Sequence, residues 1–176
     1  GEDGKLAGYF DMIGLPYTTC DALTSSITMN KGYTKAIVQD IDELFVARSI
    51  QLFDNNSENI TRILKELRLP LFIKPNNGGS SIGMSKVKEP NELQEALDKA
   101  FAEDSQVLVE EFVSGREFSI GVYRSRGITT VLPATEIISS KEFFDFEAKY
   151  SPGVCEEITP GRMTSEEVAR VNRIIE

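Results

Sequence analysis

Apolar residues at every third or fourth position predict several short helices along this chain. The predicted helices run over residues 5–13, over a brief stretch capped by Asp21 or Thr24, from the N-cap Asn30 to about Ile41, from a turn and cap at residues 55–57 to Leu67, from Pro90 to Phe101, and onward from the capping box Thr164-Ser-Glu-Glu167. Asparagine, aspartate and threonine at such starts accept a hydrogen bond from a first-turn N–H. All but the brief helix carry an apolar stripe, which is typical of amphipathic helices.

Short apolar runs bounded by glycine, proline or asparagine predict strands between these helices. The expected strands cover residues 45–53, 69–73, 84–87, 106–113, 118–123 and 128–137. Helices that alternate with strand pairs predict an α+β fold of antiparallel sheets with flanking helices. Residues 139–153 are aromatic and charged without periodicity, which indicates a functional loop rather than core.

A glycine-rich turn, Asn76-Asn-Gly-Gly-Ser-Ser81, connects two of the predicted strands and begins just after Lys74. Glycines let the backbone approach a ligand closely and point successive N–H groups at it. A lysine at the base of such a hairpin therefore suits the phosphates of a nucleotide. The turn is not a Walker loop, because no Gly-Lys-Ser/Thr follows at the required spacing and no helix starts there. An ordinary mobile hairpin is the alternative.

Lysines at two other places could serve the same anion. Lys31 and Lys35 lie one turn apart on a predicted helix, although a solvated face is the simpler explanation for such a pair. Lys149 lies beside Tyr150 in the irregular loop. A lysine on a closing loop meets a terminal phosphate only when the loop is shut, which suits transfer chemistry that excludes water. An exposed amphipathic loop is the alternative.

The strand end Val109-Glu110-Glu111-Phe112-Val113 combines carboxylates with apolar side chains, and Glu117 follows it. Alternation along a strand places Glu110 and Phe112 on one face. An adenine ring suits such a place, because its amino group needs an acceptor and its faces need apolar contacts, while a ribose needs a carboxylate. A solvated edge strand with acidic residues is the alternative.

Composition narrows the function further. The chain has 176 residues, 40% of them apolar, which is enough for a hydrophobic core. Its net charge of −9 argues against nonspecific nucleic-acid binding, and its lack of histidine excludes Ser-His-Asp and Cys-His mechanisms for the chain acting alone. Cys20 and Cys155 are far apart and are expected as free thiols. No run approaches the roughly 18 apolar residues of a membrane span and no signal peptide opens the chain, so we expect a cytoplasmic protein.

Taken together, these motifs resemble the D-alanine–D-alanine ligases of the ATP-grasp superfamily. The likeness covers nearly all of the chain, and its most specific parts are the flap Gly79-Ser-Ser-Ile-Gly-Met84 and the loop Phe143-Phe-Asp-Phe-Glu-Ala-Lys-Tyr150. Other ATP-grasp ligases, such as biotin carboxylase, lack this loop. The resemblance implies an incomplete ATP-grasp fold in three parts. They are the end of an N-terminal substrate-binding domain (1–30), the central ATP-grasp domain (31–117) and the beginning of the C-terminal domain (118–176).

The resemblance also implies an activity, the ATP-dependent ligation of two D-alanines through an acyl phosphate for peptidoglycan precursor synthesis. It places the nucleotide phosphates against Lys35, Lys74, Gly79, Ser80 and Ser81, the ribose against Glu117 and the γ-phosphate against Lys149. Glu110 would accept from the adenine amino group, and the strand end with Glu111, Phe112 and Val113 would frame the base with backbone groups. Phe143 is a further residue expected to bind the nucleotide. Ser80 and Tyr150 would form a hydrogen-bonded pair that latches the loop over the substrates. Tyr150 is typical of relatives that make a dipeptide.

Mg²⁺ is the second cofactor that the resemblance implies. The family's metal ligands, an Asp and a Glu-x-Asn, have no counterpart before Glu176, so we expect no metal ligand within this chain. We therefore expect a fragment that does not ligate alone, and a homodimer for the complete enzyme. A nucleotide-binding module without catalysis and a purely structural fragment are the alternatives, and binding of ATP with or without turnover distinguishes them.

Overall fold

The computed structural model describes residues 2–139 and 155–175. It contains two compact units, which we describe separately. The first unit consists of Gly1–Asp40 and Phe45–Val113, and the second of Ile41–Leu44 and Ser114–Glu176. In the described ranges, no helix is both long and apolar enough to cross a bilayer. Both cysteines are free thiols, as the sequence predicted.

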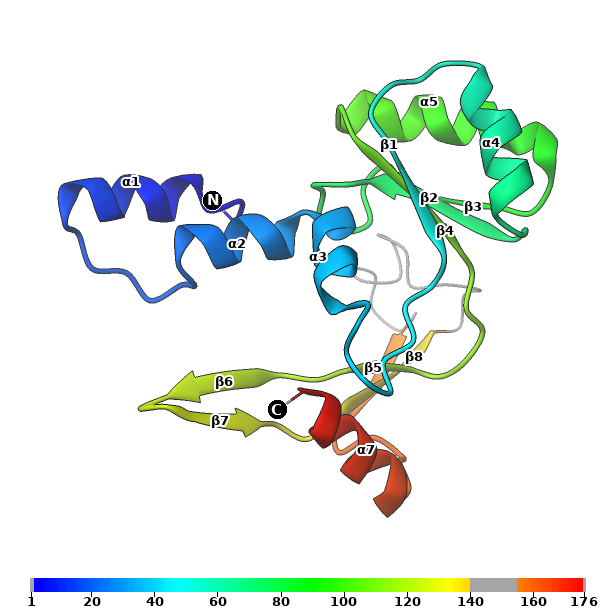
Figure 1. The fold of residues 1–176 in the computed structure, drawn as a ribbon. Coiled ribbons are helices and arrows are strands. Elements are labelled where there is room, and N and C mark those ends of the chain that lie inside the picture. The colour runs from blue at the N-terminus through cyan, green and yellow to red at the C-terminus, as the bar shows by residue number, and fades with distance from the viewer. Residues whose placement is uncertain (1, 140–154, 176) are drawn as a thin grey trace. The chain divides into compact units, whose positions relative to one another are not determined.

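The first unit begins with three helices, α1 (Lys5–Ile13), α2 (Ala22–Met29) and α3 (Lys31–Val38) (Figure 1). The predicted caps are confirmed, because Asp21 accepts a 2.7 Å hydrogen bond from Thr24 N and Asn30 accepts a 2.9 Å bond from Tyr33 N. The prediction that α3 continues to Ile41 is wrong by three residues. Ile37 is 57% exposed, so the apolar stripe of α3 is not part of the core.

A four-stranded antiparallel sheet with two helices forms the rest of this unit. Its strands have the order β1-β4-β2-β3, with β1 (Ser49–Leu52), β4 (Val107–Glu111), β2 (Leu71–Pro75) and β3 (Ser85–Val87). The helices are α4 (Glu58–Glu66) and α5 (Leu93–Glu103), which follows the single turn η1 (Pro90–Glu92). The antiparallel α+β prediction is confirmed, although β1 is shorter than the predicted 45–53.

The two faces of this sheet differ in kind. One face packs against α4 and α5, and its core consists of fully or nearly fully buried apolar side chains, among them Ile50, Ile63, Leu71, Ile73, Leu97, Val107 and Val109. Because side chains alternate along a strand, the residues between these ones point to the opposite face. That face carries Phe72, Lys74 and Glu110. Glu110 belongs to β4, which is an interior strand because it pairs with β1 on one side and β2 on the other.

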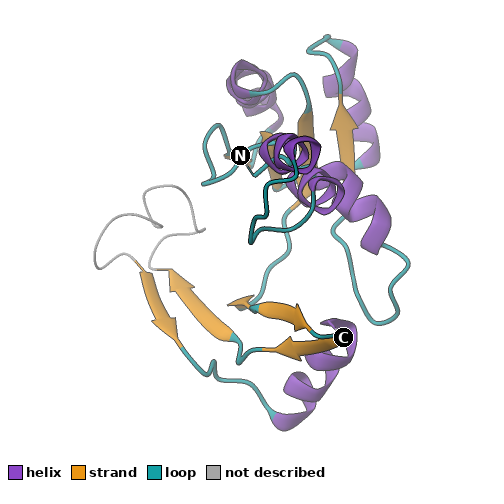
Figure 2. Cartoon of the chain, turned by 90° about the vertical axis from the view of Figure 1, so that its left-hand side faces the viewer, coloured by secondary structure: helices purple, strands orange, loops and turns teal. Residues whose placement is uncertain are grey.

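The second unit contains a three-stranded antiparallel sheet of β5 (Glu117–Ser119), β8 (Thr135–Ser139) and β9 (Cys155–Ile158) (Figure 2). A hairpin of β6 (Val122–Ser125) and β7 (Ile128–Val131) and the helix α7 (Ser165–Ile175) complete it. The capping box is confirmed, since Thr164 N and Glu167 N each bond to the other residue's side chain.

The long strands predicted at 118–123 and 128–137 are each two short strands. Gly121 separates β5 from β6, and Pro133 separates β7 from β8. Proline has no N–H to donate to a ladder and glycine weakens a strand interior, so both residues interrupt pairing. β9 was not predicted, because its segment Cys155-Glu-Glu-Ile158 has two adjacent glutamates and therefore lacks the alternation of apolar and polar residues that is typical of a strand.

Candidate nucleotide site

Three charged side chains converge on the sheet face that α4 and α5 leave uncovered. Lys35 of α3 places its Nζ 2.8 Å from Glu110 Oε2, and Lys74 of β2 pairs with Glu110 Oε1. The three side chains are only 17–21% exposed. The solvated-face alternative for Lys35 and the edge-strand alternative for Glu110 are therefore both wrong, because Lys35 is paired and β4 is an interior strand.

Two opposing effects set the charge state of this cluster. Burial raises the pKa of Glu110 and is the largest single effect, but the charge of Lys74 and the hydrogen bonds from Lys35 and Lys74 together hold this pKa below its ordinary value. Glu110 is therefore ionised at neutral pH. Two ammonium groups around one carboxylate leave one net positive charge in a partly desolvated place, which suits a compact anion.

The glycine-rich turn after β2 adopts an unusual backbone conformation. Ser80 and Ser81 have φ values of 52° and 58°, which lie in the left-handed region that non-glycine residues rarely adopt. Such conformations cost about 1–3 kcal/mol each and cluster at ligand-binding sites. In the part of the chain that the structure describes, no atom lies within 4 Å of the position that a Cβ of Gly79 would take, so its backbone is open on this side to an approaching ligand.

Lys31, one turn before Lys35 on α3, has a different environment from its neighbour. Its Nζ lies 3.1, 3.3 and 2.6 Å from the carbonyl oxygens of Pro75, Asn76 and Gly78. The sequence showed that the two lysines share a helix face but not which partners each would meet. Lys31 binds backbone carbonyls and Lys35 binds a carboxylate, because the packing of α3 brings each lysine next to different distant residues.

Two aromatic rings adjoin the cluster at the end of β4. Phe72 and Phe112 lie edge to face with their centroids 5.8 Å apart, and Lys86 Nζ lies 3.7 Å from the Phe112 centroid. Phe112 N donates to Pro70 O, so a base would meet the ring of Phe112 rather than its N–H. Lys86 was not among the predicted site residues, although it closes the same flap hairpin and pairs with Phe72 in the β2–β3 register.

Other predicted residues lie elsewhere. The Glu111 side chain accepts a hydrogen bond from Arg68 N, and Glu111 N donates to Arg48 O, so neither group faces the lysines. Val113 is 69% exposed. Glu117 begins β5 in the second unit and is exposed. Phe143, Lys149 and Tyr150 lie outside the described residues.

Within residues 2–139 and 155–175, no group of three or more His, Cys, Asp or Glu side chains is arranged to hold a metal ion. The expectation that the Mg²⁺ ligands belong to another part of the protein stays a prediction.

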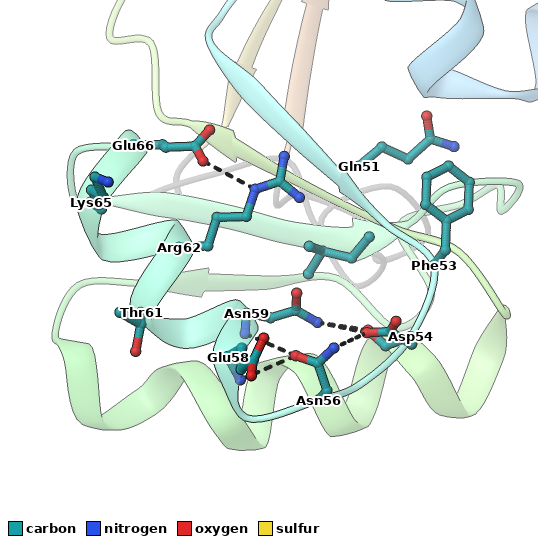
Figure 3. A pocket seen from close by; sticks show the side chains of 11 residues that line it. Gln51, Phe53, Asp54, Asn56, Glu58, Asn59, Thr61, Arg62, Lys65 and Glu66 are labelled. Atoms are coloured by element: carbon teal, nitrogen blue, oxygen red, sulfur yellow. Dashed lines mark hydrogen bonds and ion pairs between the residues drawn. The ribbon is translucent and has the colours of Figure 1, made fainter.

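A pocket of about 650 Å³ lies between β1 and α4, with Arg62 turned toward Glu66 and Asn56 toward Asp54 (Figure 3). Arg62 Nε pairs with Glu66 at 3.1 Å, and Asn56 Nδ2 donates to Asp54 at 2.7 Å. Asn56 Oδ1 also accepts from Glu58 N and Asn59 N, which caps α4. These side chains satisfy one another, and the pocket contains none of the three clustered residues Lys35, Lys74 and Glu110.

Comparison with known proteins supports the predicted family. Residues 40–176 match the family described as D-ala D-ala ligase C-terminus. A D-alanine–D-alanine ligase of Parabacteroides distasonis is 45% identical over 166 residues, which are 94% of this chain and 50% of that protein. One of Flavobacterium psychrophilum is 45% identical over 167 residues, or 95% of this chain and 50% of that protein. The chain thus spans about half the length of the curated relatives it matches.

Solved structures agree with the fold. The VanG D-Ala:D-Ser ligase of Enterococcus faecalis superposes with a TM-score of 0.88 at 35% identity, over 99% of this chain and 51% of that one. The D-alanine–D-alanine ligase of Bacillus anthracis superposes with a TM-score of 0.77 at 31% identity, over 99% of this chain and 55% of that one. The predicted ATP-grasp fold is therefore confirmed. The predicted division into residues 1–30, 31–117 and 118–176 stays a prediction.

Proposed function

This chain belongs to the D-ala D-ala ligase C-terminus family, and from that premise we propose that it supplies the ATP-binding part of an enzyme that joins two D-alanines for peptidoglycan precursor synthesis. In such a reaction a carboxylate oxygen of the first D-alanine attacks the γ-phosphorus of ATP, which forms an acyl phosphate and releases ADP. The amine of the second D-alanine then attacks the acyl carbon. The peptide bond forms as the C–O bond to phosphate breaks, and the amine loses a proton.

The observation that carries this proposal is the convergence of Lys35 and Lys74 on Glu110. Each ammonium has three N–H donors. Lys35 uses two of them on Ala47 O and Glu110, which leaves one for a phosphate oxygen. Glu110 holds the two cations side by side at the root of the flap. The α- and β-phosphates of ATP would therefore meet a prearranged pair of positive charges, which lowers the cost of assembling them on binding.

The remaining predicted roles follow from the resemblance. The flap residues Gly79, Ser80 and Ser81 would cover the phosphates, and the ring of Phe112 would contact the purine. Lys149 would place a positive charge where negative charge develops on the transferred phosphoryl group. Mg²⁺, held by ligands from elsewhere in the enzyme, would supply further positive charge to the phosphates. Cytoplasmic location and a homodimeric complete enzyme are proposed on the same basis.

Tyr150 bears on the kind of product. A tyrosine at this position is typical of relatives that form a dipeptide, so we propose a dipeptide product. The solved neighbours include a D-Ala:D-Ser ligase as well as a D-alanine–D-alanine ligase, so overall likeness does not distinguish the two amino acids. We propose D-alanine as the second substrate because curated relatives at 45% identity are D-alanine–D-alanine ligases.

Titration of ATP into this chain, followed calorimetrically, tests the proposal. Lys35→Met and Lys74→Met should each weaken ATP binding about tenfold or more, since each removes a charge-assisted bond to phosphate. Lys65→Met removes an exposed lysine of α4 and should leave the affinity unchanged, which controls for net charge. Equal affinity in all four proteins would refute the site.

A second variant tests whether ATP lies against the flap backbone, without changing any charge. Gly79→Val adds side-chain atoms where none of the described residues comes within 4 Å. It should leave the unfolding transition in place but weaken ATP binding, because only a bound ligand would collide with the new side chain.

Phosphate release that depends on D-alanine, measured with this chain alone, would contradict the expectation that the chain does not ligate by itself.

A further inference from the structure

The first turn of α3 lies against three side-chain amides, those of Gln51, Asn76 and Gln106. Gln51 belongs to β1, Asn76 directly follows β2, and Gln106 directly precedes β4. Gln106 Oε1 accepts one hydrogen bond from Gln51 Nε2 at 2.8 Å and another from Asn76 Nδ2 at 3.1 Å. The three amides, which we call the amide platform, therefore join three strands of the sheet through one oxygen atom.

α3 meets the amide platform through the backbone of Gly32. Gly32 N donates to Asn76 Oδ1 at 2.9 Å. A Cβ at Gly32 would lie 2.2 Å from Gln51 Oε1 and 2.7 Å from Gln51 Cδ, so the helix backbone touches the Gln51 amide directly. Gln51 cannot turn away from a larger residue without losing a hydrogen bond, because its Nε2 is bonded to Gln106. Glycine at position 32 thus permits a contact that a side chain would disrupt.

The position of α3 depends more on such polar contacts than on apolar burial. None of the eight residues of α3 is buried, and Tyr33 and Ile37 are 53% and 57% exposed. Asn76, by contrast, is fully buried, and its N donates to Gln106 O at 2.8 Å. A buried amide that loses a partner is costly, so the bonds of Asn76 favour one arrangement of the helix on the sheet.

The phosphate-site lysine of α3 lies close to this contact. Lys35 follows Gly32 by three positions, so the two residues are neighbours on one helix face. Lys35 Nζ donates to Ala47 O at 2.7 Å and pairs with Glu110 at 2.8 Å. A shift of the helix by about 1 Å would lengthen these bonds to more than 3.5 Å, where a hydrogen bond no longer forms. The place of the first turn therefore decides where the ammonium of Lys35 lies.

We propose that the amide platform is a positioning device for the phosphate site. It fixes the first turn of α3 against the sheet, through Gly32, so that the cationic side chains of this helix meet the phosphates of the nucleotide. Gln51, Asn76 and Gln106 act through α3 and are positioning residues. This proposal rests on the proposed function for its ligand.

Alanine at two helical glycines tests the proposal, by calorimetric titration of ATP into this chain. Gly32→Ala should weaken ATP binding about tenfold, because the new Cβ displaces either α3 or the Gln51 amide. Gly8→Ala is the matched control, since a Cβ at Gly8 of α1 would lie 3.6 Å from Ala22 Cβ, an ordinary contact. Alanine has the higher helix propensity at both positions, so a difference between the variants reports the amide platform. Equal affinity in both variants and the unmodified chain would overturn the proposal.

Hydrogen exchange tests the amide platform without any ligand. Gln106→Met removes the shared oxygen at nearly constant size, and the Gly32 amide should then exchange about tenfold faster because Asn76 loses its partner. Gln106→Glu keeps an oxygen acceptor at this place and should restore slow exchange. The amides of Ile73 and Val109 in the β2–β4 ladder should not change. Unchanged exchange of the Gly32 amide in Gln106→Met would overturn the proposal, and so would an equal acceleration of the ladder amides, which a merely structural role predicts.

Adenosine separates this proposal from the proposed function. Gly32→Ala and Gln106→Met should weaken binding of ATP about tenfold and leave binding of adenosine unchanged, because only ATP has phosphates for α3 to meet. An equal loss for both ligands would contradict a role specific to the phosphate site. If the unmodified chain binds ATP no more tightly than adenosine, the proposed phosphate site is wrong, while exchange of the Gly32 amide still decides whether the amide platform holds α3.

Discussion

The two units of this chain differ in the interactions that stabilise each of them internally. The buried apolar side chains of the described residues all belong to the first unit, where strands β1 to β4 pack against α4 and α5. In the described part of the second unit, the buried residue is a carboxylate, Glu136, with 3% exposure. The first unit therefore has its own hydrophobic core, and close packing in this core makes the sheet that carries Lys74 and Glu110 rigid. The second unit depends on strand pairing and charge.

The ion pairs of the second unit connect loops to its sheet and its helix. Arg162 Nε donates to Glu136 Oε2 at 2.7 Å, while Arg116 bonds to both Arg162 O and Glu167. Most of these side chains are half exposed. Exposed ion pairs contribute only about 0–1 kcal/mol each, so this unit has much less to lose from any one substitution.

Leucine truncation gives the largest expected difference between the units. Leu97→Ala should lower the free energy of unfolding of the first unit by about 2–5 kcal/mol, because Leu97 is fully buried and its removal leaves a cavity. Leu132→Ala in the second unit should cost about 1 kcal/mol or less, since Leu132 is 46% exposed. Urea unfolding followed by exchange at β4 and β8 amides measures both. Similar costs would show that the second unit also has an apolar core.

Neutralising a carboxylate in the first unit should have the next largest effect. Glu110→Gln leaves two half-buried ammonium groups without their anion and should cost about 1–3 kcal/mol at pH 7. The pKa of Glu110 is lowered in the folded chain, so ionised Glu110 stabilises the fold above its unfolded pKa, and this stability is lost as pH falls through the lowered folded value. The difference between the two proteins should therefore shrink below about pH 4.3. A difference that stays constant down to pH 2 would contradict the pairing.

Glycine replacement compares how tightly each unit packs around a turn. Gly83 of the first unit and Gly127 of the second have φ values of 70° and 81°. Alanine at either position costs about 1–2 kcal/mol for the left-handed backbone. Gly83→Ala adds collisions with Glu103 and Pro75, whereas Gly127 has nothing within 4 Å of a new Cβ. Thermal unfolding should show the larger loss for Gly83→Ala, and equal losses would mean that the flap has room to shift.

The sequence predicted local structure well where local chemistry decides it. Asp21, Asn30 and the Thr164 capping box start the helices that they were expected to start, and the flap hairpin lies where its glycines placed it. These features depend on residues within a few positions of one another. The motifs also identified the family and fold, because Gly79-Ser-Ser-Ile-Gly-Met84 combines several constraints in one stretch.

The sequence pattern did not predict which distant residues each side chain would contact. Spacing placed Lys31 and Lys35 on one helix face, but it did not identify their separate partners. These are Pro75 and Asn76 for Lys31 and Glu110 for Lys35, 44 to 75 positions away. Glu110 was expected at the purine end of the site, yet in the structure it pairs with both Lys35 and Lys74. The exposed apolar stripe of α3 shows the same limit, since periodicity predicts a face and not its partner.

The smallest predicted effect is local and concerns the buried carboxylate of the second unit. Glu136 accepts hydrogen bonds from Arg162 Nε and Arg162 N, and the side-chain bond from Arg162 is the main reason that the pKa of Glu136 lies below its ordinary value. Glu136→Ala removes both bonds, so the Arg162 amide should exchange several-fold faster. The Thr164 amide, which donates to Glu167, should not change. Faster exchange at both amides would mean that the whole loop depends on Glu136. The ion pair of Glu136 would then stabilise a larger part of the second unit than the residues it contacts directly.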